Sequence, residues 1–229
     1  ESRGLGDVYK RQMLYTGGTT GMPKGVMYSS GAHAAGLAAF AGSLGQPVST
    51  SVEEISDNVS TMAAAEALPV GLVCCPLMHG TGMWVGAFAT HLAGGTVITV
   101  NSLGLDADQL WSEAQLHRAT ALTIVGDAFA RPLLNALDAA HDRGEPYDIS
   151  SVQVMISSGV MWSQEIKEGL LGHNEMNLID AMGSTEGGMG SSVSNRENKV
   201  TTAKFQLNAN VKVIDDDDHE AVSYTHLTL

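Results

Sequence analysis

The chain has 229 residues, of which 44% are hydrophobic and 16% are charged, a balance typical of a globular protein that buries a core. Its 25 acidic and 12 basic residues give a formal net charge of −13, which argues against a nucleic acid or an anionic membrane as partner. The two cysteines are sequence neighbours and form no disulfide framework. With no recognisable secretory signal or bilayer-spanning apolar run, we expect a cytoplasmic protein without stable membrane insertion.

The two ends differ in character from the segments that they flank. Residues 1–12 and 221–229 share no periodicity with their neighbours, and both resemble translated adapter sequence at the ends of metagenomic reading frames. We therefore expect a non-native leader and a non-native tail, with native loops as the alternative. On this interpretation residues 13–220 start and stop inside a larger protein.

Predicted strands and helices alternate along the chain. Strands are expected at 13–16, 26–28, 70–76, 96–100, 121–125, 152–156 and 177–179. Helices are expected at 32–44, at 83–92, from Asp106 to 117, at 127–143 and after Ser163. Residues 45–58, with a proline and several serines, are expected to form a loop or insertion. This alternation predicts an α/β fold whose mostly parallel sheet is flanked by helices, with ligand loops at the carboxyl ends of its strands.

The last part of the chain has a different pattern. Residues 204–214 alternate loosely like a sheet, which predicts the start of a β-rich segment, and residues 215–218 are four consecutive aspartates. A solvated hairpin tip is favoured over a calcium site for these acids, because the spacing and the glutamate of an EF-hand are missing.

A glycine- and threonine-rich stretch at residues 14–26 is the strongest motif. Glycine lets the backbone approach a ligand, successive N–H groups form an anion-binding concavity, and threonine hydroxyls and Lys24 add donors and a charge. It is not a Walker A loop, because Pro23 precedes Lys24 and Gly25 follows it. The stretch predicts a polyphosphate-binding loop, with an ordinary glycine-rich surface loop as the alternative. Its candidate ligand-binding residues are Thr16, Gly17, Gly18, Thr19, Thr20, Gly21 and Lys24.

Two further motifs follow predicted strands. Residues 182–187 place Glu186 on a turn, where a carboxylate can hold Mg²⁺, and Thr185 beside it can donate to a phosphate oxygen. A capped helix start is the alternative for this motif. Residues 76–82 place His79 after an apolar strand, where a lone histidine is more often structural than catalytic.

Together these three motifs resemble the adenylate-forming superfamily, which includes acyl-CoA synthetases, aryl-CoA ligases, luciferases and peptide-synthetase adenylation domains. The family patterns are Tyr-Thr-Gly/Ser-Gly-Thr-Thr-Gly-x-Pro-Lys-Gly-Val, Tyr-Gly-x-Thr-Glu and Pro-Leu-Phe-His-x-x-Gly. The resemblance spans roughly residues 13–220 and implies part of the large N-terminal domain of such an enzyme. It implies an α/β nucleotide- and acyl-binding region at 13–190, followed by the start of the β-rich segment at 191–220.

The resemblance also implies roles at the nucleotide. Glu186 would hold Mg²⁺, Thr185 would contact the α-phosphate and Asp180 would line the pocket. Met182 stands where the family usually has an aromatic residue against adenine, and its polarizable side chain can still cover the ring. Residues 157–161 resemble a Ser-Gly-Gly/Ala segment whose backbone lies against adenine and the acyl group. The remaining nucleotide-binding candidates are Ser158, Gly159, Ala181 and Gly183.

Roles at the acyl group follow in the same way. His79 would lie beside the carboxylate that is activated and, with Gly80, at one wall of the acyl pocket. Met83 and Trp84 would be pocket or gate residues, unless they are the core of a buried helix. Gly126 lies in a Gly-Asp-Ala-Phe string where the family usually has a Val-Pro-Thr turn, and Val160 follows the adenine segment; both would border the acyl group.

The implied function is that of an AMP-forming acyl-CoA synthetase. A small-molecule carboxylic acid and ATP would give an acyl-adenylate, from which the thiol of coenzyme A would displace AMP. Lys24, His79, Thr185 and Glu186 would be the catalytic residues, with ATP, Mg²⁺ and coenzyme A required. The strings at residues 126–129 and 180–187 are most similar to ligases for fatty acids or steroid side chains.

Two other interpretations stay open at this stage. One is another adenylate-forming enzyme such as an aryl-CoA ligase, and the other is a non-catalytic nucleotide-binding or unstable fragment. No later ribose motif, hinge or domain with the family's catalytic lysine is recognisable, so the isolated chain is expected to be inactive in the full reaction. The sequence indicates no oligomeric state. It contains no serine-hydrolase elbow, no His-Glu-x-x-His motif and no dinucleotide-binding glycine motif.

Overall fold

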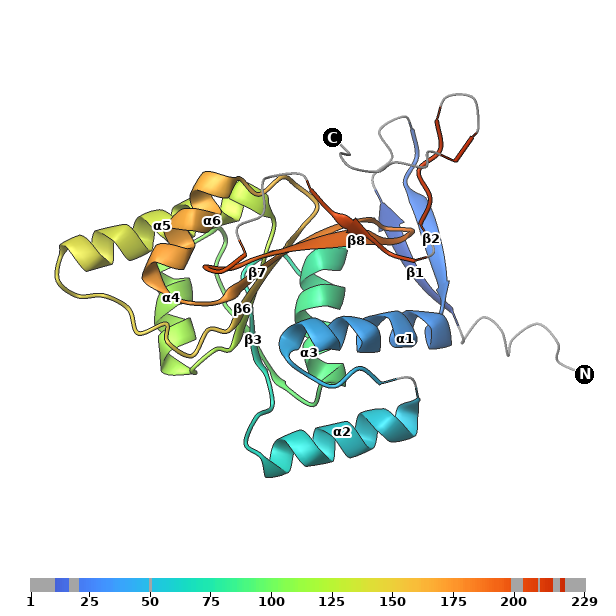
Figure 1. Cartoon of the computed structure of the whole chain (residues 1–229), viewed down its shortest axis with the longest axis horizontal. Coiled ribbons are helices and arrows are strands. Elements are labelled where there is room, and N and C mark those ends of the chain that lie inside the picture. Colours follow the sequence, from blue (N-terminus) through green and yellow to red (C-terminus); the bar gives the residue numbers. More distant parts are fainter. Residues whose placement is uncertain are drawn as a thin grey trace, which may run out of the picture.

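The computed structural model describes residues 11–16, 21–49, 51–198, 204–209, 211–215 and 219–220. Figure 1 shows how its elements are arranged around a central sheet. The strands are β1 (Arg11–Thr16), β2 (Lys24–Ser29), β3 (Val70–Val73), β4 (Thr96–Thr99), β5 (Ala121–Ile124), β6 (Val154–Ser158), β7 (Asn177–Ser184), β8 (Gly187–Ser194) and β9 (Gln206–Leu207). The helices are α1 (Ser30–Ala41), η2 (Gly42–Leu44), α2 (Val52–Ala64), η3 (Thr81–Phe88), α3 (Ala89–Leu92), α4 (Ala107–Leu116), α5 (Gly126–Asp142) and α6 (Gln164–His173).

The central sheet has seven strands in the order β4-β3-β5-β6-β7-β8-β9. The first five of these are mutually parallel, and β8 and β9 extend the sheet in antiparallel fashion. Strands β1 and β2 form a separate antiparallel pair. The predicted α/β class with a mostly parallel sheet is therefore confirmed, and the sheet becomes antiparallel toward the carboxyl end of the chain.

Helices cover both faces of the sheet. Successive side chains of the inner strands therefore point alternately to one covered face and to the other, and most of them are buried. Leu72, Leu122, Met155 and Leu178 point to one face, where they join Trp111 of α4 and residues of α5 and α6 in the largest buried cluster. The opposite face is covered by α1 and α3. Figure 1 shows these two groups of helices on either side of the strands. Both faces of the sheet are thus covered by helices, whereas the loops at the carboxyl ends of its strands are where ligands bind in such folds.

Most predicted elements are confirmed within a few residues. The Ser29 hydroxyl accepts a hydrogen bond from the Ala32 N–H at 3.2 Å at the start of α1. The Asp106 carboxylate accepts from the Gln109 N–H at 3.0 Å and caps α4, as the sequence predicts. Strand β6 begins two residues later than predicted, and the helix predicted at 83–92 begins at Thr81 as a π-helix.

The predicted loop at residues 45–58 is wrong in its second half. Helix α2 begins at Val52, and the Ser51 side chain caps it by accepting from the Glu54 N–H at 3.1 Å. Inside the helix, the Ser60 and Thr61 hydroxyls donate to carbonyls one turn earlier, at 2.8 and 2.9 Å. Of the serines that suggested a loop, Ser51 is thus the N-cap of a helix, and the hydroxyls just beyond the predicted loop have partners inside that helix.

Three smaller corrections concern turns and the last segment. Ser163 is the N-cap residue of α6, but its hydroxyl makes no capping hydrogen bond. The motif at residues 182–187 is the end of β7 and a hairpin turn into β8, so the alternative of a capped helix start is wrong. Among the described residues of 204–214, which leave out residue 210, only Gln206–Leu207 form a strand. Ile214 pairs with Glu220 as in a hairpin, although residues 216–218 lie outside the described part.

Candidate functional site

The carboxyl ends of β5, β6 and β7 meet at one edge of the sheet. Gly126, directly after β5, has φ +55°, and its N–H donates to the Ser157 hydroxyl at 2.9 Å. A Cβ on Gly126 would lie 2.7 Å from the Met161 carbonyl oxygen, so only glycine fits without a shift. Ser158 of β6 pairs in register with Ala181 of β7. The structure thus brings together Gly126, Ser158, Gly159, Val160 and Ala181, which were predicted from three separate motifs.

Beneath this edge lies a buried ion pair. The Lys167 ammonium contacts the Asp180 carboxylate at 2.9 Å, and the two side chains are only 5% and 8% exposed. Burial raises the pKa of Asp180 above its ordinary range, while the Lys167 charge acts in the opposite direction. The ammonium also lies 5.3 Å from the centre of the Trp162 ring. Asp180, predicted to line the nucleotide pocket, is therefore held inside the fold by a cation.

A second carboxylate ties the same loops together. Asp127, which follows Gly126, accepts a hydrogen bond from the Ser163 N–H at 2.8 Å, and its own N–H donates to the Met161 carbonyl at 3.3 Å. The loops after β5 and β6 are thereby fixed to each other and to the start of α6.

Lys167 is the residue at this edge that the sequence prediction missed. A signal was present: Lys167 falls on the same face of α6 as the buried residues Ile166, Leu170 and Leu171. A lysine within an apolar stripe requires either a snorkelling side chain or a buried partner.

The turn between β7 and β8 presents Glu186 to solvent. The Ser184 hydroxyl lowers the pKa of the Glu186 carboxyl through a hydrogen bond, so this side chain is ionised at neutral pH. Its charge reaches Tyr28 of β2: the pKa of Tyr28 is raised by burial first and by Glu186 second. The turn that carries Glu186 therefore lies near enough to β2 to act on Tyr28, which is four residues along the strand from Lys24.

Three rings from three elements pack together at this place. The centre of the Tyr28 ring lies 5.0 Å from the centres of both His33 in α1 and Trp84 in η3, and His33 and Trp84 are 4.7 Å apart. Burial lowers the pKa of His33, which favours its neutral form. Within the described part of the chain, neither the Tyr28 hydroxyl nor His33 Nε2 has a hydrogen-bond partner. The cluster was not predicted from the sequence beyond Trp84.

The predicted His79 segment forms a turn that leads into η3. The His79 N–H donates to the Pro76 carbonyl at 3.1 Å, and the His79 side chain is exposed. A Cβ on Gly82 would overlap the Pro76 carbonyl oxygen, so this turn requires glycine. The Trp84 ring lies over Gly80, where a Cβ would be 3.0 Å from it. Met83 and Trp84 are half-buried, a position compatible with either of their predicted roles.

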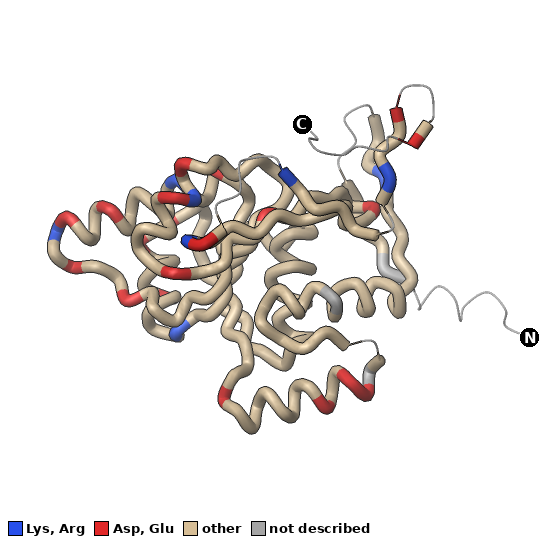
Figure 2. The backbone as a smooth tube through the Cα atoms, viewed as in Figure 1, with Lys and Arg blue, Asp and Glu red and all other residues tan. Residues whose placement is uncertain are grey.

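The phosphate-loop motif is only partly described. Thr16 and Lys24 pair at the ends of β1 and β2, and the Thr16 hydroxyl donates to the Lys24 carbonyl at 3.4 Å. Lys24 is exposed and enters no ion pair within the described residues. Gly17, Gly18, Thr19 and Thr20 lie outside the described residues. Lysines and arginines are sparse throughout the described backbone (Figure 2), so an anionic ligand here depends on local donors.

The donor set at this edge fits a phosphate-bound Mg²⁺. In the part of the chain that the structure describes, no three His, Cys, Asp or Glu side chains are grouped to hold a metal ion. Mg²⁺ usually takes one or two carboxylates and completes its shell with water and substrate phosphates, and the single ionised Glu186 supplies such a carboxylate. Cys74 and Cys75 are free and buried, and burial raises the pKa of the Cys75 thiol to about 12, so neither is a candidate nucleophile. Within the described residues, no helix combines the length and apolarity needed to cross a bilayer.

Comparison with known proteins identifies relatives along almost the whole chain. A medium/long-chain-fatty-acid–CoA/3-oxocholest-4-en-26-oate–CoA ligase of Mycolicibacterium smegmatis is 34% identical over 223 residues, which cover 93% of this chain and 38% of the relative. A 3-oxocholest-4-en-26-oate–CoA ligase of Rhodococcus rhodochrous is 34% identical over 195 residues, covering 83% of this chain and 33% of the relative. The chain thus spans between a third and two fifths of the length of these relatives.

Solved structures share the fold at lower identity. A long-chain-fatty-acid–CoA ligase from Archaeoglobus fulgidus superposes with a TM-score of 0.58 at 19% identity, covering 91% of this chain and 39% of that structure. An amide bond synthetase from Marinactinospora thermotolerans gives a TM-score of 0.64, also at 19% identity, over 91% of this chain and 37% of that structure. The model of the family described as AMP-binding enzyme matches residues 11–225. The chain therefore belongs to the AMP-binding enzyme family.

Proposed function

We propose that the chain is the nucleotide- and acyl-binding part of an AMP-forming acyl-CoA synthetase for a fatty or steroid-like acid. One observation carries the proposal: four of the predicted motifs follow the carboxyl ends of β3, β5, β6 and β7, which are parallel strands of one sheet. The loops after β5 and β6 are joined by the contacts of Gly126 and Asp127, and Ser158 is paired with Ala181. The Glu186 turn adjoins the strand pair of Lys24 through Tyr28.

In this proposal the phosphates of ATP lie between Lys24 and Glu186. The Lys24 ammonium and the amides and hydroxyls of the loop that precedes it bind the phosphates, and Thr185 donates to the α-phosphate. Glu186 is an exposed, ionised carboxylate that would hold Mg²⁺, and the bound ion would supply charge neutralisation at the phosphates. Most of the rate enhancement comes from positioning the acid's carboxylate against the α-phosphate.

The adenine and the acyl group occupy the two sides of the same edge. Ser158, Gly159, Asp180, Ala181, Met182 and Gly183 form the adenine side, where the exposed backbone at Gly159 allows close approach. His79, Gly80, Met83, Trp84, Gly126 and Val160 form the acyl side. Because the Mycolicibacterium smegmatis and Rhodococcus rhodochrous relatives, each 34% identical to the chain, act on fatty or steroid acids by name, we infer the same substrate class here.

We also propose that the chain alone holds ATP weakly. In this proposal residues 13–190 form the binding region and 191–220 begin the β-rich segment, and the chain spans only 38% and 33% of the length of the two relatives, so a whole ligase has further residues that can contact ATP. Each missing hydrogen bond weakens binding by about 0.5–1.5 kcal/mol, so three or four of them reduce affinity by orders of magnitude. We therefore expect a dissociation constant of about a millimolar or weaker for Mg-ATP.

A complete ligase that contains this chain tests the proposed reaction. Residues 13–220 would replace the matching segment of the Mycolicibacterium smegmatis relative, and acid-dependent pyrophosphate release would be measured with fatty, steroid, aryl and amino acids. We expect release with fatty or steroid acids and its loss in Lys24→Ala. Release with amino acids alone would reject the acyl-CoA assignment, and release with aryl acids alone would favour an aryl-CoA ligase. Circular dichroism of the hybrid, compared with that of the relative, verifies that it folds.

A further inference from the structure

A cavity of about 430 Å³ lies at the opposite edge of the sheet from the proposed nucleotide site. It is lined by the last turns of α5 and α6 and by residues 146–149, which precede β6. Helices in a parallel α/β fold run against the strands, so these helix ends lie near the amino ends of β6 and β7. The volume is within the range of small-molecule sites. None of the roles proposed above uses this cavity.

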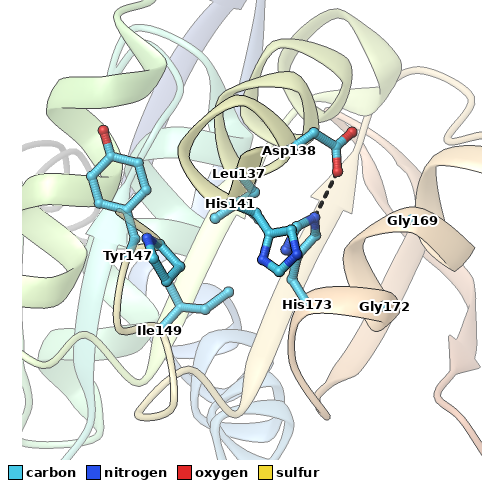
Figure 3. A pocket seen from close by; sticks show the side chains of 9 residues that line it. Leu137, Asp138, His141, Tyr147, Ile149, Gly169, Gly172 and His173 are labelled. Carbon is cyan, nitrogen blue, oxygen red and sulfur yellow. Dashed lines mark hydrogen bonds and ion pairs between the residues drawn. The ribbon is translucent and has the colours of Figure 1, made fainter. Parts of the chain in front are cut away.

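The polar groups of the cavity accept hydrogen bonds. Asp138 Oδ1 lies 2.7 Å from His173 Nε2, and Figure 3 shows these two side chains facing each other across the opening. A carboxylate only accepts, so Nε2 carries the hydrogen and Nδ1 of the neutral ring is left with a lone pair. Asp138 Oδ2 has no protein donor within the described chain. The Tyr147 hydroxyl donates to Asp108 Oδ1 at 2.7 Å, so its proton already has an acceptor.

The groups that line the cavity favour a cation, while Arg143 acts electrostatically on Tyr147 in its wall. No lysine or arginine is among its lining residues, whereas Asp138 is, and its side chain is 57% exposed. The carboxyl ends of α5 and α6 add the negative ends of two helix dipoles. The carboxyl end of α6 already binds one cation, because the Arg196 guanidinium donates to the Leu171 carbonyl at 2.8 Å.

The walls of the cavity add an apolar contribution. Leu137, Pro146 and Ile149 line it, and the rings of His141 and His173 meet edge to face with centres 6.2 Å apart. Figure 3 shows Tyr147 and Ile149 beside the two imidazoles. Aromatic rings and alkyl side chains next to a carboxylate suit a ligand with a protonated nitrogen and a short hydrocarbon part.

We propose that this cavity binds a small organic cation, with an ammonium group on Asp138 Oδ2 and an alkyl part against Leu137, Pro146 and Ile149. The site is independent of the proposed acyl-CoA synthetase reaction, because it lies at the other edge of the sheet and shares no residue with it.

The test is an NMR titration of the ¹⁵N-labelled chain with three four-carbon probes that differ only in their head group: n-butylammonium, n-butanol and butyrate. The amides of Gly169 and Gly172 line the cavity and report on its occupation. At slightly alkaline pH, where histidines are ordinarily neutral, and at physiological salt, we expect saturable shifts with butylammonium. We expect binding of butanol and butyrate to be about tenfold weaker or absent.

Two variants separate the site from the general acidity of the chain. Asp138→Asn keeps an acceptor for His173 Nε2 but removes the charge, and it should weaken butylammonium binding about tenfold. Asp142→Asn removes an exposed acid of the same helix that does not line the cavity, and it should leave binding unchanged. The proposal is overturned by equal binding of butanol, by equal effects of the two variants, by shifts spread over the acidic surface, or by no saturable shift of Gly169 and Gly172.

Discussion

The buried pair of Lys167 and Asp180 gives the sharpest prediction about stability. Lys167→Met keeps much of the side-chain volume but removes the ammonium that lies 2.9 Å from Asp180. Asp180 is then a buried carboxylate without a cation, and the charge of Asp127 already opposes its ionisation. Breaking a buried pair at one partner typically costs about 3–5 kcal/mol of unfolding free energy, because the remaining charge is not compensated.

The direction of the pH effect follows from the pKa of Asp180. Burial raises that pKa above its ordinary value, and without Lys167 it rises further. A carboxyl with a raised folded-state pKa stabilises the folded chain below its unfolded pKa and loses this contribution as the pH rises through the folded value. The deficit of Lys167→Met relative to the parent chain should therefore be larger at pH 8 than at pH 5.5, two values above the sequence pI of about 4.8.

Urea unfolding followed by far-UV circular dichroism measures these differences. The double variant Lys167→Met/Asp180→Leu should recover most of the loss, because an apolar pair of similar size needs no compensation. Glu175→Gln is the matched control: its ion pair with Arg196 is 3.1 Å long, but the side chains are about half exposed, so we expect a loss under about 1 kcal/mol. A loss under about 1 kcal/mol for Lys167→Met, or a double variant no more stable than the single one, would refute the reasoning.

Three other predictions test separate parts of the account. Because burial lowers the pKa of His33, the free energy of unfolding should fall as the pH drops below about 6.5. In urea unfolding, His33→Phe should make the free energy of unfolding depend less on pH in this range. The same pH dependence in the variant and the parent chain would contradict this prediction. Gly126→Ala should lower the free energy of unfolding by about 1–3 kcal/mol, since φ is +55° and the new Cβ would meet the Met161 carbonyl oxygen. Gly36→Ala, in open space within α1, should raise the free energy of unfolding slightly. Similar effects of both variants would disprove the strain at Gly126. In the hybrid ligase, Glu186→Gln should slow adenylation and raise the Mg²⁺ requirement, and unchanged kinetics would exclude Glu186 as a metal ligand.

The parallel sheet could be predicted because its strands are short apolar runs separated by helical periodicity and turn residues. Leu72, Leu122, Met155 and Leu178 are all fully buried, and each stands in a predicted strand. Helix α2 was missed because serines are common both in loops and at helix N-caps, and here Ser51 caps the helix by accepting a hydrogen bond from the Glu54 N–H. Local composition does not reveal which of these two arrangements the tertiary structure selects.

At the site too, residues that belong to local motifs could be predicted, whereas contacts between distant elements could not. Gly126, Gly159 and Glu186 could be named from motifs, because glycine and carboxylate requirements are local. The Lys167–Asp180 pair joins residues on α6 and β7, and the ring cluster joins Tyr28, His33 and Trp84 from three elements. Such contacts depend on how helices cross the sheet, which one sequence without relatives does not specify.

The central claim is that nucleotide binds at the carboxyl edge of the sheet, and an NMR titration of the ¹⁵N-labelled chain with Mg-ATP tests it most directly. The account predicts saturable shifts of the Gly126, Gly159 and Gly183 amides, with a dissociation constant of about a millimolar or weaker, and weaker binding in Lys24→Ala. The chemical shifts of the Gly169 and Gly172 amides, at the opposite edge of the sheet, should not change. Shifts at that opposite edge alone, or none at the carboxyl edge at saturating Mg-ATP, would contradict the claim. A micromolar dissociation constant that is lost in Lys24→Ala would show instead that the chain is a complete nucleotide site on its own.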